Sequence, residues 1–386
     1  MVAMKEVQIA LAWGDGSAPE TMAPAVKIAD SAAKLDGIQI VWVETPMGWC
    51  AFEKYGDTLP EISMKNATKC GILFFGGVGE KSLDKTLGVK YPKMKPEGRC
   101  LLTIRDEWGL LVNERPAIYY PGLEGIANVR PDAIPANGIR QIWLRFLLED
   151  SYFGNRRFAN KLGLQAKSLL GVCLKDEVTG NEQIVSDIAF YHRKSIEEYF
   201  QYAFGRAREV GVPLICVDKS NVMPRYVFWR RIAEKIHEEK FPDVEMKKFY
   251  SDDTTRLLFH PKMLEGVIAC GNEHGDMLSD GALEAVGSMG MMYSSAKNLK
   301  SGAAMFESGA GTYPEAKGQN IANPIGRILT AAMMLRHIGA EKGADAIERA
   351  VRTTLEWGYR TKDIASPQCQ TLGTAEIGAM ILSHLK

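Results

Sequence analysis

Short apolar runs alternate with segments of helical periodicity along the first part of the chain. Val7–Trp13, Ile38–Val43 and Gly71–Phe75 are apolar runs of strand length, and the first and third end in glycine-rich turns. Ala23–Leu35 follows the first run and places its apolar residues at helical spacing. Strands that alternate with helices build a mostly parallel sheet covered on both faces. The pattern therefore predicts a doubly wound α/β fold.

The middle and the end of the chain repeat this alternation. We expect strands at Ile142–Leu147, Ser168–Leu174 and Leu214–Val217, and helices at Lys194–Val210 and Val227–Glu239. Asn323 and Pro324 predict a helix start, with a cap and a proline in the first turn. The following helix would bury a face made of Ile325, Ile328, Leu329, Ala332 and Leu335. With 386 residues, the chain is long enough for two domains.

Composition and charge argue against several classes of function. Lysine plus arginine and aspartate plus glutamate number 47 each, so no net charge draws the chain to nucleic acid or to an anionic membrane. The seven cysteines form no C-x-x-C pair, which is typical of a reducing compartment. The first residues predict a strand rather than a signal peptide, and no apolar stretch approaches the ~20 residues that cross a bilayer. We expect a cytoplasmic protein without nucleic-acid or membrane partners.

The turn at Gly76–Ser82 has the composition of a phosphate-binding loop. In a P-loop a glycine stands directly before the lysine, so that backbone amides can wrap the phosphates, whereas Glu80 stands there in this chain. A carboxylate at that position favours a strand-end turn beside a ligand site over a P-loop. No G-x-G-x-x-G follows a strand, so a conventional Rossmann fingerprint is also missing. A dinucleotide would have to be held in another way.

Two aspartates stand four residues apart in the segment Gly275–Asp280. Asp276 and Asp280 would share one helix face and could bind a hard divalent cation. Solvated acidic pairs at this spacing are common, so the spacing by itself is weak support for a metal site. The pair Asp252-Asp253 offers a third carboxylate.

Basic and aromatic side chains add candidate chemistry. The planar forks of Arg105, Arg115 and Arg145 suit a polyanionic organic acid, although three unrelated ion pairs would give the same pattern. Lys219 follows an apolar strand and could act as a base, but a lysine packed along the surface is the simpler interpretation. Tyr152 is by default a packed aromatic residue. The six histidines form no H-x-x-x-H metal motif.

Several ordered motifs extend over nearly the whole chain. They are Gly14–Glu20 (GDGSAPE), Tyr55–Glu61, Leu101–Ala117 (LLTIRDEWGLLVNERPA), Arg145 with Tyr152–Gly154, Val217–Val222, Asn272–Asp280 and Gly318–Pro324. Together they resemble the isocitrate/isopropylmalate dehydrogenase family of β-decarboxylating dehydrogenases. The resemblance implies a large domain made of residues 1–110 and 277–386 and a small, dimer-forming domain at 111–276.

The resemblance also implies a role for each candidate residue. Asp252, Asp276 and Asp280 would bind Mg²⁺ or Mn²⁺. The substrate would contact Arg105, Arg115, Arg145, Leu101, Leu102 and Asn221. Lys219 would take part in deprotonating the substrate hydroxyl, and Tyr152 would protonate the enol carbon. In the family the residues matching Lys219 and Asp252 come from the partner subunit, which implies a homodimer with a shared active site.

By the same resemblance, NAD would bind through the loops Gly76–Leu87 and Glu307–Asn323. The residues expected to contact it are Gly77, Gly79, Glu307, Gly309, Gly311, Thr312, Glu315 and Asn323. Glu315 stands where the family separates users of NAD from users of NADP. A carboxylate accepts hydrogen bonds from a ribose and repels a 2′-phosphate, which predicts NAD.

The chain departs from the family pattern at several positions. Ala310 replaces a histidine that packs near the adenosine, so the adenine could be seated differently. The pocket residues Lys95-Pro96-Glu97 with Leu101-Leu102 resemble isopropylmalate enzymes, although the glutamate is one residue out of register. Glu149-Asp150 and Gly318-Gln319-Asn320 resemble isocitrate enzymes instead.

The expected function is therefore NAD- and metal-dependent oxidative decarboxylation of a 3-isopropylmalate-type acid. The alternatives are an isocitrate dehydrogenase, a D-malate- or tartrate-type dehydrogenase, and a catalytically silent regulatory subunit. Against the silent subunit, the candidate aspartates, arginines, lysine and tyrosine are all present together.

Overall fold

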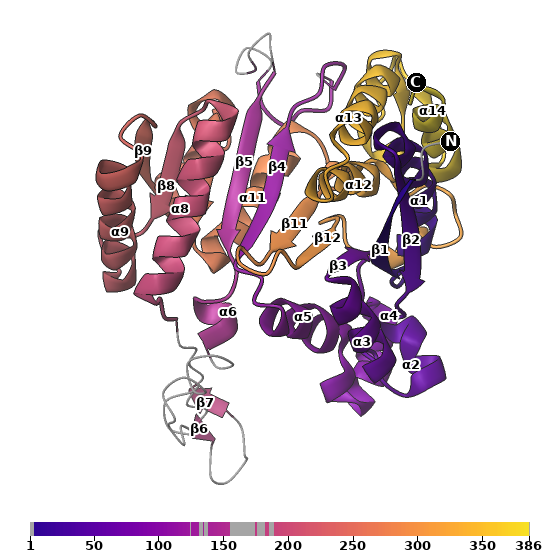
Figure 1. Ribbon diagram of the computed structural model, residues 1–386, viewed down its shortest axis with the longest axis horizontal. Coiled ribbons are helices and arrows are strands. Elements are labelled where there is room, and N and C mark those ends of the chain that lie inside the picture. Colours follow the sequence, from indigo (N-terminus) through magenta and orange to yellow (C-terminus); the bar gives the residue numbers. More distant parts are fainter. Residues whose placement is uncertain are drawn as a thin grey trace. The chain divides into compact units, whose positions relative to one another are not determined.

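The computed structural model describes residues 4–123, 125–130, 134, 138–154, 174–175, 182–184 and 189–385. The chain divides into two compact units. Unit 1 consists of Met1–Leu110, Glu114–Arg140 and Ala282–Lys386, and unit 2 of Leu111–Asn113 and Gln141–Gly281. Figure 1 labels the helices and strands of both units.

Unit 1 contains a mostly parallel sheet with strand order β2-β1-β3-β12-β11-β4. Its strands are β1 (Lys5–Ala12), β2 (Ile38–Glu44), β3 (Ile72–Phe75), β4 (Val112–Ile118), β11 (Ser294–Lys297) and β12 (Ala304–Glu307). β1 is parallel to β2 and β3, and β12 is parallel to β3, whereas β11 is antiparallel to β12. Ile9–Ala12 and Leu73–Phe75 are buried, as expected for strands covered on both faces.

Two groups of helices accompany this sheet. The first contains α1 (Ala18–Ala33), α12 (Ile325–His337), α13 (Glu341–Glu356) and α14 (Thr374–Ser383), which contact one another (Figure 1). The second contains α2 (Trp49–Tyr55), α3 (Glu61–Cys70), α4 (Lys81–Lys90) and α5 (Leu102–Glu107). A five-residue π-helix, Glu97–Leu101, leads directly into α5. Two short strands, β13 (Tyr359–Arg360) and β14 (Gln370–Thr371), pair with each other.

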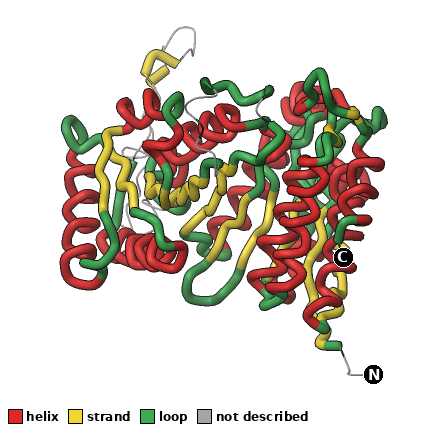
Figure 2. Tube along the Cα trace, turned by 90° about the horizontal axis from the view of Figure 1, so that it is seen from above, coloured by secondary structure: helices red, strands yellow, loops and turns green. Residues whose placement is uncertain are grey.

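Unit 2 has a parallel sheet of order β5-β10-β8-β9. These strands are β5 (Arg140–Phe146), β8 (Leu214–Asp218), β9 (Met246–Tyr250) and β10 (Gly266–Cys270). Its helices are α6 (Ser151–Phe153), α8 (Arg193–Val210), α9 (Pro224–Lys240), α10 (Ser251–Leu257) and α11 (Asn272–Val286). β6 (Leu174–Lys175) pairs antiparallel with β7 (Glu182–Ile184). Aromatic rings of Phe146, Tyr191, Tyr199, Phe200 and Trp229 pack together in its core. Figure 2 shows the helices running alongside the strands.

Most of the predicted elements are confirmed. The strand predictions correspond to β1, β2, β3, β5 and β8, and the helix predictions to α1, α8, α9 and α12. Residues 168–173 of the predicted strand Ser168–Leu174 lie outside the described residues. Pro24 lies inside α1, which begins five residues before the predicted start. α12 begins at Ile325, so Pro324 precedes the helix instead of lying in its first turn, while Asn323 Oδ1 accepts a hydrogen bond from the Ile325 amide at 2.9 Å.

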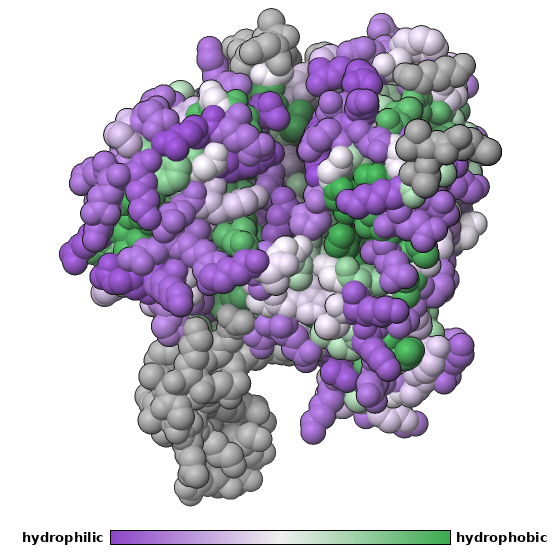
Figure 3. Space-filling view, in the orientation of Figure 1, coloured by the Kyte–Doolittle hydropathy of each residue, from purple (hydrophilic) through white to green (hydrophobic). Residues whose placement is uncertain are grey.

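The apolar residues are mainly inside the two units. Figure 3 shows hydrophilic side chains over most of the visible face, with smaller hydrophobic areas between them. Among the described residues, no helix has both the length and the apolar character needed to cross a membrane.

Close backbone contact between two glycine turns provides a first test of this fold. A Cβ added at Gly14 would lie 2.0 Å from the carbonyl oxygen of Gly77, whereas a Cβ at Gly37 would meet no atom within 4 Å. Both glycines have positive φ, so alanine costs about 1–2 kcal/mol at either position through the backbone alone. We expect Gly14→Ala to destabilise the protein by roughly 3 kcal/mol or more, because the clash adds to this cost. Thermal unfolding measures the difference, and equal midpoints for Gly14→Ala and Gly37→Ala would contradict the contact.

Candidate active site

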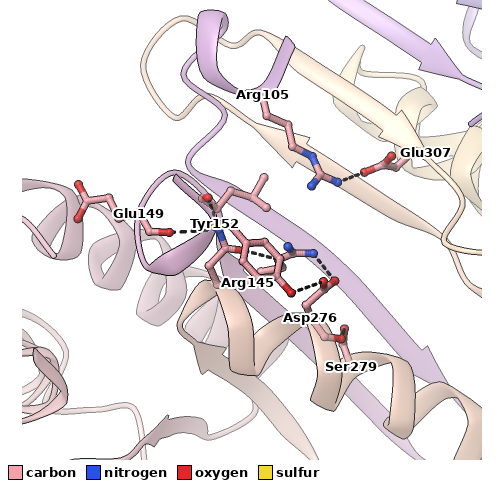
Figure 4. Close-up of polar contacts among 9 residues, drawn as sticks. Arg105, Arg145, Glu149, Tyr152, Asp276, Ser279 and Glu307 are labelled. Carbon is pink, nitrogen blue, oxygen red and sulfur yellow. Dashed lines mark hydrogen bonds and ion pairs between the residues drawn. The ribbon is translucent and has the colours of Figure 1, made fainter. Parts of the chain in front are cut away.

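One group of candidate residues gathers in unit 2 around Asp276 (Figure 4). Arg145, near the end of β5, forms an ion pair with Asp276 on α11. The hydroxyl of Tyr152 on α6 donates to Asp276 Oδ2 at 3.1 Å, and the Arg145 guanidinium lies 5.2 Å from the centre of the Tyr152 ring. The Tyr152 side chain is 40% exposed, whereas Arg145 is 3% exposed. A buried cation, a carboxylate and a partly exposed phenol therefore meet at one place.

The start of α11 brings these side chains together. Asn272, the first residue of α11, donates to the carbonyl of Leu147 at 2.5 Å and accepts from Arg145 Nε at 2.7 Å. A Cβ at Gly275 would lie 3.1 Å from Cβ of Arg145, so the missing side chain lets the helix pack closely against β5. The spacing of these residues thus has a geometric reason. Asn272 anchors the start of α11, Gly275 allows the close contact with β5, and Asp276 then places its carboxylate beside Arg145.

The electrostatics keep the Tyr152 phenol protonated. Burial and the nearby negative charge of Asp276 raise the pKa of Tyr152, while Arg145 opposes this effect. A phenol that holds its proton near neutral pH can donate it to a bound molecule. Tyr152 is therefore suited to act as an acid.

The three predicted metal ligands do not come together within this chain. Asp280 lies one turn after Asp276 on α11, where residues i and i+4 share a face. Asp252 lies at the start of α10, where its Oδ1 is 2.5 Å from Lys219 Nζ. The hydrogen bond from Lys219 lowers the pKa of the Asp252 carboxyl. No group of three or more His, Cys, Asp or Glu side chains in the described part of the chain could hold a metal ion.

In unit 1, Arg105 faces Glu307 across a buried ion pair of 2.5 Å (Figure 4). Arg105 lies in the last turn of α5 and is 4% exposed, and Glu307 ends β12. The Nε atom of Arg105 is buried and has no hydrogen-bond partner within the described part of the chain. A buried donor without a partner is costly, so an oxygen ligand beside Arg105 would satisfy it.

The other predicted substrate residues lie on separate elements. Arg115 is buried on β4, and Leu101 and Leu102 stand at the junction of the π-helix with α5 and are partly buried. The guanidinium of the neighbouring Arg99 donates two hydrogen bonds to the carboxylate of Asp57, at 3.1 and 2.8 Å. Asn221 lies in the exposed turn after β8.

The predicted nucleotide loops of unit 1 are joined by Asp15. Its carboxylate accepts hydrogen bonds from the backbone amides of Trp49, Cys50 and Gly79, at 2.8–2.9 Å. Gly77 accepts from the Asp15 amide at 3.0 Å, and Ser17 donates to the carbonyl of Thr312. Burial raises the pKa of Asp15, while the three amides oppose that effect. The glycines at 76–79 and the loop at Thr312 are thus tied to the loop after β1.

Arg327 on α12 forms hydrogen bonds with the same group of loops. Its guanidinium donates to the carbonyls of Phe75 and Gly311 at 2.9 and 3.0 Å and to the hydroxyl of Thr21 at 3.4 Å. Burial lowers the pKa of Arg327 to about 10, and Glu307 opposes this shift, so the side chain stays charged at neutral pH.

The remaining predicted cofactor residues belong to this loop region. A Cβ at Gly309 would overlap the sulfur of Met292, so only glycine fits there without a rearrangement. Glu315 is exposed on a short 3-10 turn, Pro314–Ala316. Asn323 donates to Asp363 at 3.0 Å, and its Oδ1 accepts from the amide of Ile325, the first residue of α12. These contacts order the loop, while the Glu315 carboxylate stays accessible.

The sequence interpretation missed the roles of Asp15 and Arg327. Asp15 belongs to the motif Gly14–Glu20, which predicts no role for it, and Arg327 stands inside an apolar helix pattern. An arginine among consecutive apolar residues was the available sign, because a charge on a buried face needs partners.

Known proteins match this chain along its whole length. A family model described as isocitrate/isopropylmalate dehydrogenase matches residues 8–381. The 3-isopropylmalate dehydrogenase of Pectobacterium atrosepticum is 35% identical over 378 residues, which are 98% of this chain and 97% of that protein. The protein of the same name from Escherichia coli K12 is 34% identical over 382 residues, 99% of this chain and 98% of that one. The crystal structure of isocitrate dehydrogenase from Methylococcus capsulatus has a TM-score of 0.79 at 26% identity and covers 98% of this chain and 99% of that one. These matches confirm the predicted α/β fold class.

The role of Arg327 can be tested against an arginine on the same helix. Arg327→Met removes the guanidinium donors from the buried carbonyl of Phe75 and from the carbonyl of Gly311, and a buried carbonyl left unpaired costs about 1–3 kcal/mol. Arg336 lies near the end of α12 and is partly exposed, and it forms ion pairs with Glu341, Asp345 and Glu348. Such pairs contribute about 0–1 kcal/mol. Thermal unfolding should show a much larger loss for Arg327→Met than for Arg336→Met, and similar losses would contradict its anchoring role.

Proposed function

Because this chain belongs to the isocitrate/isopropylmalate dehydrogenase family, we propose that it is an NAD- and divalent-metal-dependent enzyme. It would oxidatively decarboxylate a 2-hydroxy acid that carries a carboxylate on C3, of the 3-isopropylmalate type. The family and its relatives support the reaction class of a β-decarboxylating dehydrogenase. The observation that carries the proposal is the cluster of Arg145, Tyr152 and Asp276, a carboxylate-binding fork beside a proton donor.

The carboxylate donors fit a divalent cation. Asp276 and Asp280 provide hard oxygen ligands from one helix face, and Asp252 of a second copy would complete the set. When bound, the cation would polarise the carbonyl that forms at C2.

The side chains of the chain itself would perform the proton transfers. Lys219 would take the proton of the C2 hydroxyl while the hydride leaves C2 for the nicotinamide. Arg105, Arg115 and Arg145 would hold the carboxylates of the substrate through paired hydrogen bonds. Breaking of the bond between C3 and its carboxyl group would release CO₂ and leave an enolate, and Tyr152 would give its proton to C3.

A homodimer follows from the same proposal. Lys219 and Asp252 are paired with each other and not with the Asp276 cluster. Val222, beside Asn221, is 64% exposed, and Met277, beside Asp276, is 58% exposed. Apolar side chains beside candidate catalytic residues suit a surface covered by a second copy of the chain.

NAD is the proposed cofactor because of Glu315. The loops tied by Asp15 and Arg327 are rich in glycine, and the space beside Gly311, where a Cβ would stand, is open. The exposed Glu315 carboxylate could accept hydrogen bonds from the adenosine ribose and would repel a 2′-phosphate.

The substrate side chain is proposed to be apolar. Arg99 is held by Asp57, and Leu101 and Leu102 offer aliphatic surface at the junction before Arg105. The relatives named 3-isopropylmalate dehydrogenase agree with this choice, whereas the name of the Methylococcus structure favours isocitrate. A cytoplasmic location is proposed along with this activity.

The direct test is NADH formation at 340 nm by the purified protein with Mg²⁺ and NAD. Parallel assays with 3-isopropylmalate, isocitrate, D-malate and tartrate, each with and without EDTA, would identify the substrate. We expect EDTA-sensitive turnover, fastest with 3-isopropylmalate. An absence of turnover with every acid, with NADP also tried, would favour a silent subunit.

Mixing two inactive variants tests whether the active site is shared. Asp276→Asn and Asp252→Asn should each abolish turnover while the dimer persists. A mixed dimer of the two would retain one intact site, so random reassociation should recover about a quarter of the wild-type activity. Asp253→Asn serves as the control, because Asp253 pairs with Arg256 and should be dispensable. No recovery after proven subunit exchange would contradict a shared site.

Replacement of Glu315 tests the cofactor assignment. Glu315→Gln keeps the length of the side chain but removes the charge that would repel a phosphate. We expect KM for NAD to rise about tenfold, the equivalent of ~1.4 kcal/mol, and the preference for NAD over NADP to fall. Steady-state kinetics with both cofactors measures this ratio, and an unchanged ratio would place the ribose elsewhere.

A further inference from the structure

Asp150 has a backbone conformation that is unusual for an aspartate. It lies directly before α6, with φ 70° and ψ −164°, in a region that is populated almost only by glycine. A residue held in this region costs on the order of 1–3 kcal/mol, and such residues persist only where neighbouring contacts hold them. Two positions later stands Tyr152. The strained residue thus sets the direction in which α6 leaves β5.

Contacts from three directions hold Asp150. The residue is fully buried, and its Oδ1 accepts the amide of Ser151 at 3.1 Å. The hydroxyl of Tyr191 donates to Oδ2 at 2.8 Å, and Arg225 Nε lies 3.5 Å from Oδ1. The Asp150 amide donates to the carbonyl of Phe190. The carboxylate therefore joins α6 to the segment before α8 and to the first turn of α9.

The same cluster reaches the start of α11. A Cβ at Gly271 would lie 2.2 Å from the Tyr191 hydroxyl oxygen and 3.0 Å from Asp150 Oδ2, so the cluster occupies the space beside Gly271. Ser151 donates to Glu273 at 3.1 Å. The chain segments leading to Tyr152 and to Asp276 are therefore both packed against one buried carboxylate.

We propose that Asp150 is a positioning residue that orients Tyr152 toward Asp276 through its strained backbone and its contacts with Tyr191 and Arg225. The catalytic part of this inference rests on the proposed function of Tyr152. The geometric part does not, because it concerns the hydrogen bond between Tyr152 and Asp276.

Three variants separate the components of this device. Asp150→Gly relieves the backbone strain and removes every side-chain contact. Asp150→Asn keeps the acceptor for the Ser151 amide, removes the charge and places an NH2 donor opposite the Tyr191 hydroxyl, which can turn to accept from it. Tyr191→Phe removes one donor and leaves Asp150 in place, so it remains informative if Asp150→Gly fails to fold.

Crystal structures of the variants test the geometric part. We expect the Tyr152 hydroxyl to move away from Asp276 in Asp150→Gly and Tyr191→Phe, and to keep its hydrogen bond in Asp150→Asn. An unchanged hydrogen bond in both of the first two variants would overturn the inference, whatever reaction the protein catalyses.

Kinetics test the catalytic part. Asp150→Gly should lower kcat on the order of 100-fold while KM for both substrates stays nearly unchanged, as expected for a misplaced acid. Asp150→Asn should keep most of the wild-type kcat. In a Tyr152→Phe background, Asp150→Gly should have almost no further effect, because the two residues act through one group. Additive losses would mean that Asp150 acts independently of Tyr152. A Tyr152→Phe variant with normal kcat would overturn the role of Tyr152 in the proposed function, and the structures would still decide the geometric part.

Discussion

Buried backbone groups that must find partners are the constraint on which both units depend. Where a turn at the end of a buried strand removes amides and carbonyls from water, these groups need partners within the protein. In unit 1, Asp15 accepts three amides and Arg327 donates to two carbonyls and a hydroxyl. One anion and one cation therefore order loops that come from residues far apart in the sequence. The backbone amides stabilise the charge of Asp15, and the backbone carbonyls stabilise the charge of Arg327.

Unit 2 meets the same constraint with side chains that also carry the candidate chemistry. Asn272 satisfies the carbonyl of Leu147 and at the same time holds the guanidinium of Arg145. Arg145 in turn holds Asp276, and Asp276 receives the hydroxyl of Tyr152. Residues with a structural role and candidate catalytic residues are thus linked in one chain of hydrogen bonds. A substitution of any of these residues would change the position of the Tyr152 hydroxyl, and Tyr152 is the most exposed of them.

The sequence predicted the fold well where apolar periodicity is strong. β1, β2, β3 and α12 agree with their apolar patterns, because burial decides both the pattern and the structure. Ordered motifs also identified the family. The contacts of these anchors could not be predicted, because Arg327 binds two backbone carbonyls and one hydroxyl from three separate segments, and residue types do not reveal which segments meet. The conformation of Asp150 could not be predicted for a similar reason, because a positive φ at an aspartate does not change the hydropathy pattern.

The candidate catalytic charges share one property that bears on specificity. Arg105 is paired with Glu307, Arg145 with Asp276 and Lys219 with Asp252 in this chain by itself. A substrate carboxylate that reaches Arg105 or Arg145 would exchange one carboxylate for another, so the net gain from charge is small. Charge would then select the class of acid and its orientation, and the aliphatic surface at Leu101 and Leu102 would select among acids of that class. One methylene in an apolar pocket changes the free energy of binding by about 1–3 kcal/mol, which is enough to separate side chains that differ by a few carbons. Under the proposed function, the junction between the π-helix and α5 would therefore select the substrate, while the arginines would orient it for the reaction.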